Sequence, residues 1–398
     1  MKLKTINTVL RHDMCLGCGL CKVYGNVKMI CNEKGFLPDK VVKNSRMDQI
    51  CPSVGYNIKT LGEQLFPGTL YSYELGHYKG LYTTRSLNRS LLKNASSGGI
   101  ITAIAAHLLI HKYVDGVVCN RFTYNGPYVR TQPYIAYSVE DLIDGQGSKY
   151  CPTDTLVALE EIKNNSGKKY CLIATPCQVA GFRLASKYDD SLSESVPFVI
   201  SNFCGGYRDF RELDYYVSRI AGFSTVSFFR HRGGGQPGSM LIKNNEGKEY
   251  TYPYPDYAHL SPIVKNERCT LCIDATGELA DFSCGDAWLK DRKDMSEPLS
   301  IVIPRSDRAL SILKEMKMMG EILLNEVTEH EVKESQRYNI DSKKYRQLQR
   351  IKARNSLLLY SPNWFNCIED KGASLLKEYR IILSKAKQNL KYGIKRNK

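Results

Sequence analysis

The amino-acid sequence predicts an α/β protein built from three parts. Residues 1–60 form a small ferredoxin-like iron–sulfur module, residues 61–325 a central α/β domain, and residues 326–398 a helical, basic C-terminal extension. Three features lead to this prediction: closely spaced cysteines near the N-terminus, alternating strand-like and helix-like apolar runs in the middle, and Lys- and Arg-rich helical patterns at the end. A chain of 398 residues with 42% hydrophobic content can form two or three domains.

The N-terminal cysteines have the spacing of a ferredoxin-type cluster. They are Cys15, Cys18, Cys21 and Cys51, a C-x2-C-x2-C run followed by a remote Cys-Pro. A [4Fe–4S] cluster needs four converging thiolates, and two-residue gaps allow one tight loop to supply three of them. Zinc sites usually present two separated C-x2-C pairs, and thiols this close together are poorly placed for disulfides with one another. The sequence therefore predicts an iron–sulfur cluster, with zinc and disulfides as the alternatives.

The central region alternates between strand and helix patterns from about residue 91 to residue 325. Strands are expected over residues 113–119, 169–174 and 197–201, and helices over residues 100–109, 139–143, 153–162 and 178–186. This alternation is typical of an α/β layer with a largely parallel sheet. Residues 225–302 are richer in strand patterns, and residues 306–398 are mainly helical.

A second group of cysteines falls within the central region. Cys177 and Cys204 each follow a predicted buried strand, so a parallel sheet would bring both to its carboxyl edge, where open α/β folds bind ligands. Cys269 and Cys272 add a C-x2-C pair, which completes the four thiols that a second [4Fe–4S] cluster requires. Alternatively, Cys177 could be a nucleophile at a helix N-terminus, the C-x2-C pair could bind zinc, and any of the four could be a small buried apolar residue.

Seven short motifs follow one another along the chain. In order they are Ser96-Ser97-Gly98-Gly99, Gly147-Ser148-Lys149-Tyr150, Thr175-Pro176-Cys177-Gln178, Phe203-Cys204, Phe229-Arg230, Cys269-x-x-Cys272, and Glu278-Leu279-Ala280-Asp281-Phe282-Ser283-Cys284-Gly285-Asp286-Ala287-Trp288. Over about residues 10–325 the chain resembles the β subunit of coenzyme F420-reducing hydrogenase and its flavin-dependent relatives, which include plant 7-hydroxymethyl chlorophyll a reductase.

The resemblance implies an FAD bound in the central α/β domain beside a [4Fe–4S] cluster. In that family the cysteines of the matching motifs ligate the cluster, which here would be Cys177, Cys204, Cys269 and Cys272. Relatives with an N-terminal ferredoxin module often carry two complete cysteine runs. This chain lacks four of those eight cysteines, and the remaining four form one complete site. We therefore expect two [4Fe–4S] clusters and one FAD.

The candidate flavin-binding residues are Ser96, Ser97, Gly98, Gly99, Lys149, Asp281 and Asp286. The Ser-Ser-Gly-Gly segment precedes a predicted helix, where it could serve only as a cap or could bind a phosphate at the free N–H groups. The resemblance favours phosphate binding. Lys149 could face the pyrophosphate or the reduced flavin, although most lysines are solvated surface charges. The two aspartates could form turns, or they could contact flavin or substrate.

Charge and hydropathy indicate the kinds of partner. The chain has 56 Lys and Arg against 41 Asp and Glu, and residues 377–398 contain eight Lys or Arg and one Glu. No nucleic-acid-binding motif is present, so we expect no nucleic-acid partner; the basic surface suits an acidic electron donor. The simplest interpretation of the basic tail is a solvated segment, and contact with an anionic membrane surface is also compatible with it. We expect no signal peptide, no membrane span and a cytoplasmic location.

These features lead to one functional hypothesis and two alternatives. The first is an iron–sulfur flavoprotein oxidoreductase that passes electrons from reduced ferredoxin, or a similar donor, through two [4Fe–4S] clusters to FAD and an organic substrate, with a sugar or polysaccharide precursor as the suggested class. The second is an electron-transfer subunit that links F420 or NAD(P)H to a partner enzyme. The third is a binding protein with structural clusters. The sequence does not decide whether the chain forms a homo-oligomer.

Overall fold

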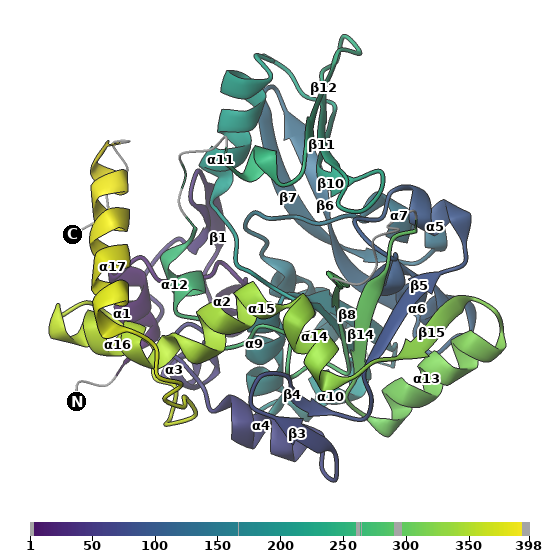
Figure 1. Cartoon of the computed structure of the whole chain (residues 1–398), viewed down its shortest axis with the longest axis horizontal. Coiled ribbons are helices and arrows are strands. Elements are labelled where there is room, and N and C mark those ends of the chain that lie inside the picture. Colours follow the sequence, from purple (N-terminus) through teal and green to yellow (C-terminus); the bar gives the residue numbers. More distant parts are fainter. Residues whose placement is uncertain (1–3, 166, 260–262, 264, 290–296, 392–398) are drawn as a thin grey trace.

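The fold is built on a mixed eight-stranded sheet. The computed structural model describes residues 4–165, 167–259, 263, 265–289 and 297–391. In spatial order the strands are β15 (Ile322–Glu326), β5 (Tyr82–Ser86), β14 (Ser300–Pro304), β13 (Phe282–Asp286), β9 (Phe198–Asn202), β8 (Tyr170–Ala174), β6 (Gly116–Asn125) and β7 (Tyr128–Ala136). Figure 1 shows this sheet in the centre and right of the molecule.

The sheet is parallel only in its middle. The pairs β6–β8, β8–β9 and β9–β13 are parallel, whereas the other four pairs are antiparallel. The expectation of a largely parallel sheet is therefore wrong for both outer parts. The reason is local at one edge, where a short turn containing Gly126 returns the chain directly and forms the β6–β7 hairpin.

Helices cover both faces of the sheet. They are α6 (Ile100–Ile110), α7 (Val139–Asp144), α8 (Leu159–Asn164), α9 (Pro176–Ser186), α10 (Asp190–Ser195) and α13 (Asp307–Met318), with a 3-10 turn η1 (Thr155–Ala158) before α8. Alternate strand residues point to opposite faces. Val117 shares a core with α6 and α13, while Val118 shares a core with α8, α9 and α10. The predicted helices at 100–109, 139–143 and 178–186 are confirmed within one or two residues.

The N-terminal part joins the same core as the sheet. Its elements are α1 (Ile6–Arg11), α2 (Leu20–Tyr24), β1 (Met29–Asn32), β2 (Gly35–Pro38), α3 (Arg46–Ile50), α4 (Ile58–Leu65), β3 (Leu70–Ser72), β4 (Gly76–Tyr78) and α5 (Arg89–Lys93). Leu20 and Met47 are buried in one continuous cluster with Leu172 of β8 and Phe182 of α9. Residues 1–60 thus pack directly onto the α/β layer.

A small antiparallel sheet lies in the upper part of the molecule in Figure 1. It consists of β10 (Phe228–Gly233), β11 (Ser239–Lys243) and β12 (Glu249–Pro253). The accompanying helical segments are α11 (Phe210–Tyr215), the π-turn η2 (Tyr216–Ile220), the 3-10 turn η3 (Asp256–His259) and α12 (Glu267–Thr270). Phe210, Tyr216, Phe229 and Met240 form its core.

The C-terminal part is helical, as expected. It comprises α14 (Glu329–Ser335), α15 (Arg337–Ile340), the π-turn η4 (Asp341–Tyr345), α16 (Gln347–Ser356) and α17 (Leu375–Lys391), with α17 upright at the left of Figure 1. Glu378 of α17 is fully buried and pairs with Arg346 and Arg350. Among the described residues, no helix is both long and apolar enough to cross a bilayer.

Candidate functional site

The first cysteine group converges between three short helices. Cys15 and Cys18 lie in the loop between α1 and α2, Cys21 lies in α2, and Cys51 ends α3. Burial, with the charge of Cys51 adding to it, raises the pKa of Cys15 to about 12. Gly17 N–H donates to the Cys15 sulfur at 3.3 Å. Four thiolates in such a place need compensating positive charge, which the irons of a cluster supply.

The second cysteine group surrounds a cavity of about 70 Å³. Cys177 lies in the first turn of α9, Cys204 follows β9, and Cys269 and Cys272 lie in and just after α12; all four line the cavity. Thr175 caps α9 and thereby fixes the position of Cys177. Burial, together with the nearby charges of Cys269 and Cys204, raises the pKa of Cys177 to about 12. The sheet edge therefore gathers the predicted ligands in one place.

The spacing of the sulfurs differs from that of a mononuclear metal site. All 14 cysteines are free thiols. Tetrahedral zinc, with Zn–S bonds of about 2.3 Å, holds its sulfur ligands about 3.8 Å apart. Within the part of the chain that the structure describes, no three cysteine sulfurs lie within 4.8 Å of one another. Neither cysteine group therefore has three sulfurs as close together as a tetrahedral zinc ion would hold them.

The two cysteine groups are direct neighbours. Leu16, inside the first cysteine loop, also lines the second cavity. The Tyr207 hydroxyl, near Cys204, donates to the Leu16 carbonyl oxygen at 3.2 Å. Burial raises the pKa of Cys18, and the charge of Cys177 contributes to this increase. Redox groups bound in both places would thus lie close together.

A larger cavity, of about 270 Å³, adjoins the second cysteine group. The walls that the two cavities share are formed by Lys149, Tyr150, Thr153, Thr175, Gln178, Asn202 and Phe203. The larger cavity lies where β8 and β9 end and where α6 and α9 begin, which is the usual position of ligands in open α/β sheets. Of the predicted flavin-binding residues, Ser96, Ser97, Gly99, Lys149 and Asp286 line this cavity.

The Ser-Ser-Gly-Gly segment is held tightly against the sheet. Gly99 caps α6 with a φ of 70°, a conformation that suits glycine. Gly98 N–H donates to the Ser300 hydroxyl at 3.0 Å, and a Cβ atom on Gly98 would lie only 2.7 Å from the Thr84 carbonyl oxygen. Gly98 therefore packs against the strands of the sheet and does not line the cavity.

Lys149 reaches the wall common to both cavities. Its ammonium donates to the carbonyl oxygens of Gly145 and Gly147 at 2.8 and 3.2 Å. Burial lowers the pKa of Lys149 to about 8. A partly desolvated cation in this wall favours an anionic ligand group.

The two predicted aspartates have different surroundings. Asp286 forms a two-pronged ion pair with Arg232, with both N–O distances 2.6 Å. Asp281 lies outside the cavity lining, where it pairs with Arg183 at 2.9 Å and accepts a hydrogen bond from Val199 N–H.

The cations that sequence reasoning missed at the site include Arg232 and Lys343. Arg232 lies on β10, is only 2% exposed and also donates to the Ser96 carbonyl oxygen. Lys343, on η4, lines the cysteine cavity. The only sequence signal for either was its residue type, because both are distant along the chain from the residues that they contact.

Family comparisons cover most of the central region. Residues 81–160 match the family model for the N-terminal part of the coenzyme F420 hydrogenase/dehydrogenase beta subunit, and residues 167–330 match the model for the C terminus of the same subunit. The chain belongs to this beta-subunit family. This family member is 25% identical over 259 residues to the coenzyme F420 hydrogenase subunit beta of Methanothermobacter thermautotrophicus, covering 62% of this chain and 84% of the relative.

Two further comparisons give a more distant relative and a solved structure with the same fold. The F420-dependent formate dehydrogenase subunit beta of Methanocaldococcus jannaschii is 23% identical, with 51% of this chain and 52% of the relative covered. The F420-reducing [NiFe] hydrogenase complex of Methanosarcina barkeri contains a chain with the same fold. This family member resembles it with a TM-score of 0.57 and 19% identity, over 74% of this chain and 98% of that one.

The family models and the site overlap only in part. Within this beta-subunit family member, the second cysteine group lies entirely inside the C-terminal model. The first cysteine group and Lys343 lie outside both models.

Proposed function

We propose that this chain is an iron–sulfur flavoprotein oxidoreductase of the cytoplasm, which transfers electrons between a donor such as reduced ferredoxin and an organic substrate. One observation carries this proposal. The first cysteine group, the cysteine cavity and the larger cavity adjoin one another in that order, joined through Leu16 and then through the shared wall at Lys149.

The two cysteine groups suit two separate [4Fe–4S] clusters. One cluster would be held by Cys15, Cys18, Cys21 and Cys51, and the other by Cys177, Cys204, Cys269 and Cys272. The backbone donors at Gly17 and Gly206, each 3.3 Å from a cysteine sulfur, support this assignment. Among the described residues, no three cysteine sulfurs lie within 4.8 Å of one another, which is also compatible with it. On this proposal, residues 1–60 act as the ferredoxin-like module and residues 61–325 as the flavin-binding domain.

The larger cavity suits the FAD. When bound, a flavin exchanges single electrons with clusters and a hydride with organic molecules. The N-terminus of α6, with Ser96 and Ser97, would face a phosphate group, because free N–H groups and the helix dipole attract anions. Lys149 would offset negative charge from the wall of the cavity, and Arg232 would keep Asp286 and Ser96 in place.

A second candidate function is supported by the names of the relatives. Several are beta subunits of F420-linked hydrogenases or formate dehydrogenases. By analogy, this chain would be the electron-transfer subunit that links F420 or NAD(P)H to a partner enzyme, and the basic surface would contact that partner.

Anaerobic reduction of the purified chain tests the proposal and separates the two candidates. We expect about one FAD per chain to be released on denaturation, and we expect reduced ferredoxin to bleach the bound flavin without any other protein. Oxidation of this reduced protein by candidate substrates would then be screened, with sugar and polysaccharide precursors first. Absence of flavin would refute the flavoprotein assignment. Bleaching by reduced F420 or NADPH alone, with a partner co-purifying in equal amount, would support the second candidate.

A further inference from the structure

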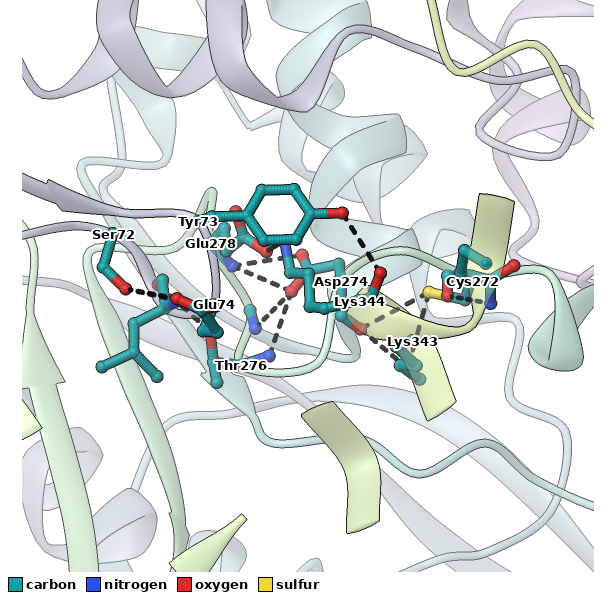
Figure 2. Close-up of polar contacts among 12 residues, drawn as sticks. Ser72, Tyr73, Glu74, Cys272, Asp274, Thr276, Glu278, Lys343 and Lys344 are labelled. Atoms are coloured by element: carbon teal, nitrogen blue, oxygen red, sulfur yellow. Dashed lines mark hydrogen bonds and ion pairs between the residues drawn. The ribbon is translucent and has the colours of Figure 1, made fainter. Parts of the chain in front are cut away.

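Two buried lysines from the C-terminal part lie beside the second cysteine group. Lys343 and Lys344 belong to η4, beyond the end of both family models, and are only 4% and 3% exposed. Figure 2 shows Lys343 next to Cys272, and Lys344 beside Glu278 and Asp274. Lys343 therefore brings a segment from outside both family models into the wall of the cysteine cavity.

Lys343 contacts a predicted cluster ligand directly. Its ammonium donates to the Cys272 sulfur at 3.5 Å and to the Asp274 carbonyl oxygen at 2.7 Å (Figure 2). Lysine is ordinarily protonated at neutral pH, and both groups that the Lys343 side chain contacts are acceptors, which favour the ammonium form.

The nearby carboxylates have other partners. Glu278 pairs with Lys344 at 2.5 Å. The Asp274 carboxylate accepts hydrogen bonds from the N–H groups of Thr276, Gly277 and Glu278. Within the described ranges, Lys343 forms no ion pair with a carboxylate. Its positive charge therefore acts mainly on the cysteine sulfurs.

We propose that Lys343 raises the reduction potential of the cluster held by Cys177, Cys204, Cys269 and Cys272. This inference rests on the proposed function, since it requires the cluster. Reduction adds one negative charge, and a fixed ammonium that also donates a hydrogen bond to a ligand sulfur stabilises the reduced state. Lys344 pairs with Glu278, so this buried carboxylate has its own cation and leaves Lys343 to the cysteine side of the site.

The test is a potentiometric titration of the anaerobic holoprotein, followed by electron paramagnetic resonance. We expect Lys343→Met to retain the wild-type iron content but to weaken reduction of this cluster about tenfold, which for a one-electron couple is about 59 mV. Lys343→Gln, which keeps a donor but loses the charge, should give part of this shift. Lys352→Met is the matched control, because Lys352 is half-exposed on α16 and lies outside the cavity lining.

The outcomes separate this inference from the proposed function. Wild-type protein without the second cluster would refute the proposed function itself. An intact second cluster with an unchanged potential in Lys343→Met would refute the inference alone. If Lys343→Met loses iron, the Lys343→Gln variant decides: an unchanged potential there overturns the proposal, and a lowered one supports it.

A different observation supports a separate metal site at the far end of α6. His107 and His111 lie one helical turn apart, and Glu321 precedes β15. One ligand atom from each of these three residues lies within 4.8 Å of the others. The His107 Nδ1–Glu321 distance is 2.9 Å, and the His111 Nε2–Glu321 distance is 3.6 Å.

Glu315 and Tyr113 lie on the other side of the His107 ring. The other ring nitrogen, Nε2, is buried without a hydrogen bond in the described part of the chain and lies 3.5 Å from Glu315. The Tyr113 hydroxyl donates a hydrogen bond to the Glu315 carboxylate at 2.8 Å. Metal-binding histidines typically donate their second N–H to a carboxylate, and Glu315 lies within reach of that role here. We infer that His107, His111 and Glu321 bind a divalent transition-metal ion such as zinc, a His₂Glu set that leaves a fourth position open.

Zinc binding to the cluster-loaded, chelator-treated protein tests this second inference. We expect wild-type protein to take up one more zinc ion per chain in equilibrium dialysis than His111→Ala, and we expect zinc to raise the Tm of wild type but not that of His111→Ala. His259→Ala, which alters an exposed histidine on η3, should behave like wild type. Equal zinc uptake by wild type and His111→Ala would overturn the inference, because cysteine-bound zinc would be common to both.

Discussion

At the scale of single residues, the Arg232–Asp286 pair supports one wall of the larger cavity. Arg232 is almost fully buried, and it contacts both the Asp286 carboxylate and the Ser96 carbonyl oxygen. The pair thereby connects the end of β13 to the segment that precedes α6. A buried charge of this kind is stable only while its partner is present.

Replacing Arg232 should therefore destabilise the protein strongly. Arg232→Met leaves Asp286 without its partner, and we expect a loss of about 3–5 kcal/mol in the free energy of unfolding. Arg121→Met is the matched control; Arg121 is partly exposed and pairs loosely with Asp144 at 3.6 Å. That change should cost less than about 1 kcal/mol. Similar costs for both variants in denaturant unfolding would contradict this assignment.

Protonation of the buried Asp154 carboxylate should make the stability of the protein depend on pH. Its Oδ1 atom is buried without a hydrogen bond among the described residues, and burial raises the pKa of Asp154 to about 6. The folded pKa lies above the unfolded value of about 3.9, so the protonated form stabilises the fold below about pH 4. This contribution is lost as pH rises through about 6.

The Asp154→Asn variant should remove this dependence. The free energy of unfolding of wild type relative to the variant should fall by about 1–2 kcal/mol between pH 4.5 and pH 7.5. Thermal unfolding of both proteins across that range measures the difference, and Asp144→Asn, at an exposed position, provides the control. A constant difference between wild type and Asp154→Asn would show that Asp154 does not titrate near pH 6.

At the scale of elements, sequence reasoning succeeded where local signals are strong. The helix predicted to begin at residue 139 is α7, which Ser138 caps, and the apolar runs of α6, β8 and β9 were recognised. It failed for β7, because polar residues alternate along this edge strand and its pairing depends on the hairpin turn. Such tertiary contacts leave little trace in local sequence.

The C-terminal helix shows the same limit. The simplest sequence interpretation of residues 377–398 was a solvated basic segment. In the structure, Glu378 is buried between two arginines, and one of them, Arg350, donates to the carbonyl oxygen of Thr270 in the second cysteine segment. A single acidic residue in a basic run thus fixes the helix in place.

Glu378→Gln should consequently weaken the attachment of α17. Arg346 and Arg350 would lose their carboxylate partner, and we expect a loss of about 3–5 kcal/mol in stability. Lys377→Gln, one position earlier and exposed, is the control and should be close to neutral. Equal melting temperatures for Glu378→Gln and wild type would indicate that α17 contributes little to the folded state.

At the scale of the whole molecule, sequence spacing predicted the members of each cysteine group but not their arrangement. A C-x2-C run would suit cluster ligation because its two-residue gaps let one tight loop present neighbouring thiols together. The contact between the two groups through Leu16 and Tyr207, and the position of Lys343, depend on segments about 190 and 70 residues apart in sequence. The same reasoning could not distinguish Asp286, in the cavity wall, from Asp281, behind it.

The central claim is that one folded unit holds two neighbouring four-iron clusters beside a flavin cavity. The most direct test is the iron and sulfide content of anaerobically purified wild type, a Cys15→Ser and Cys18→Ser double variant, and a Cys204→Ser and Cys269→Ser double variant. We predict about eight irons per wild-type chain and about four in each variant, because each variant removes two ligands from a different cluster. About four irons in wild type, an equal iron content in all three proteins, or zinc in place of iron would contradict the account.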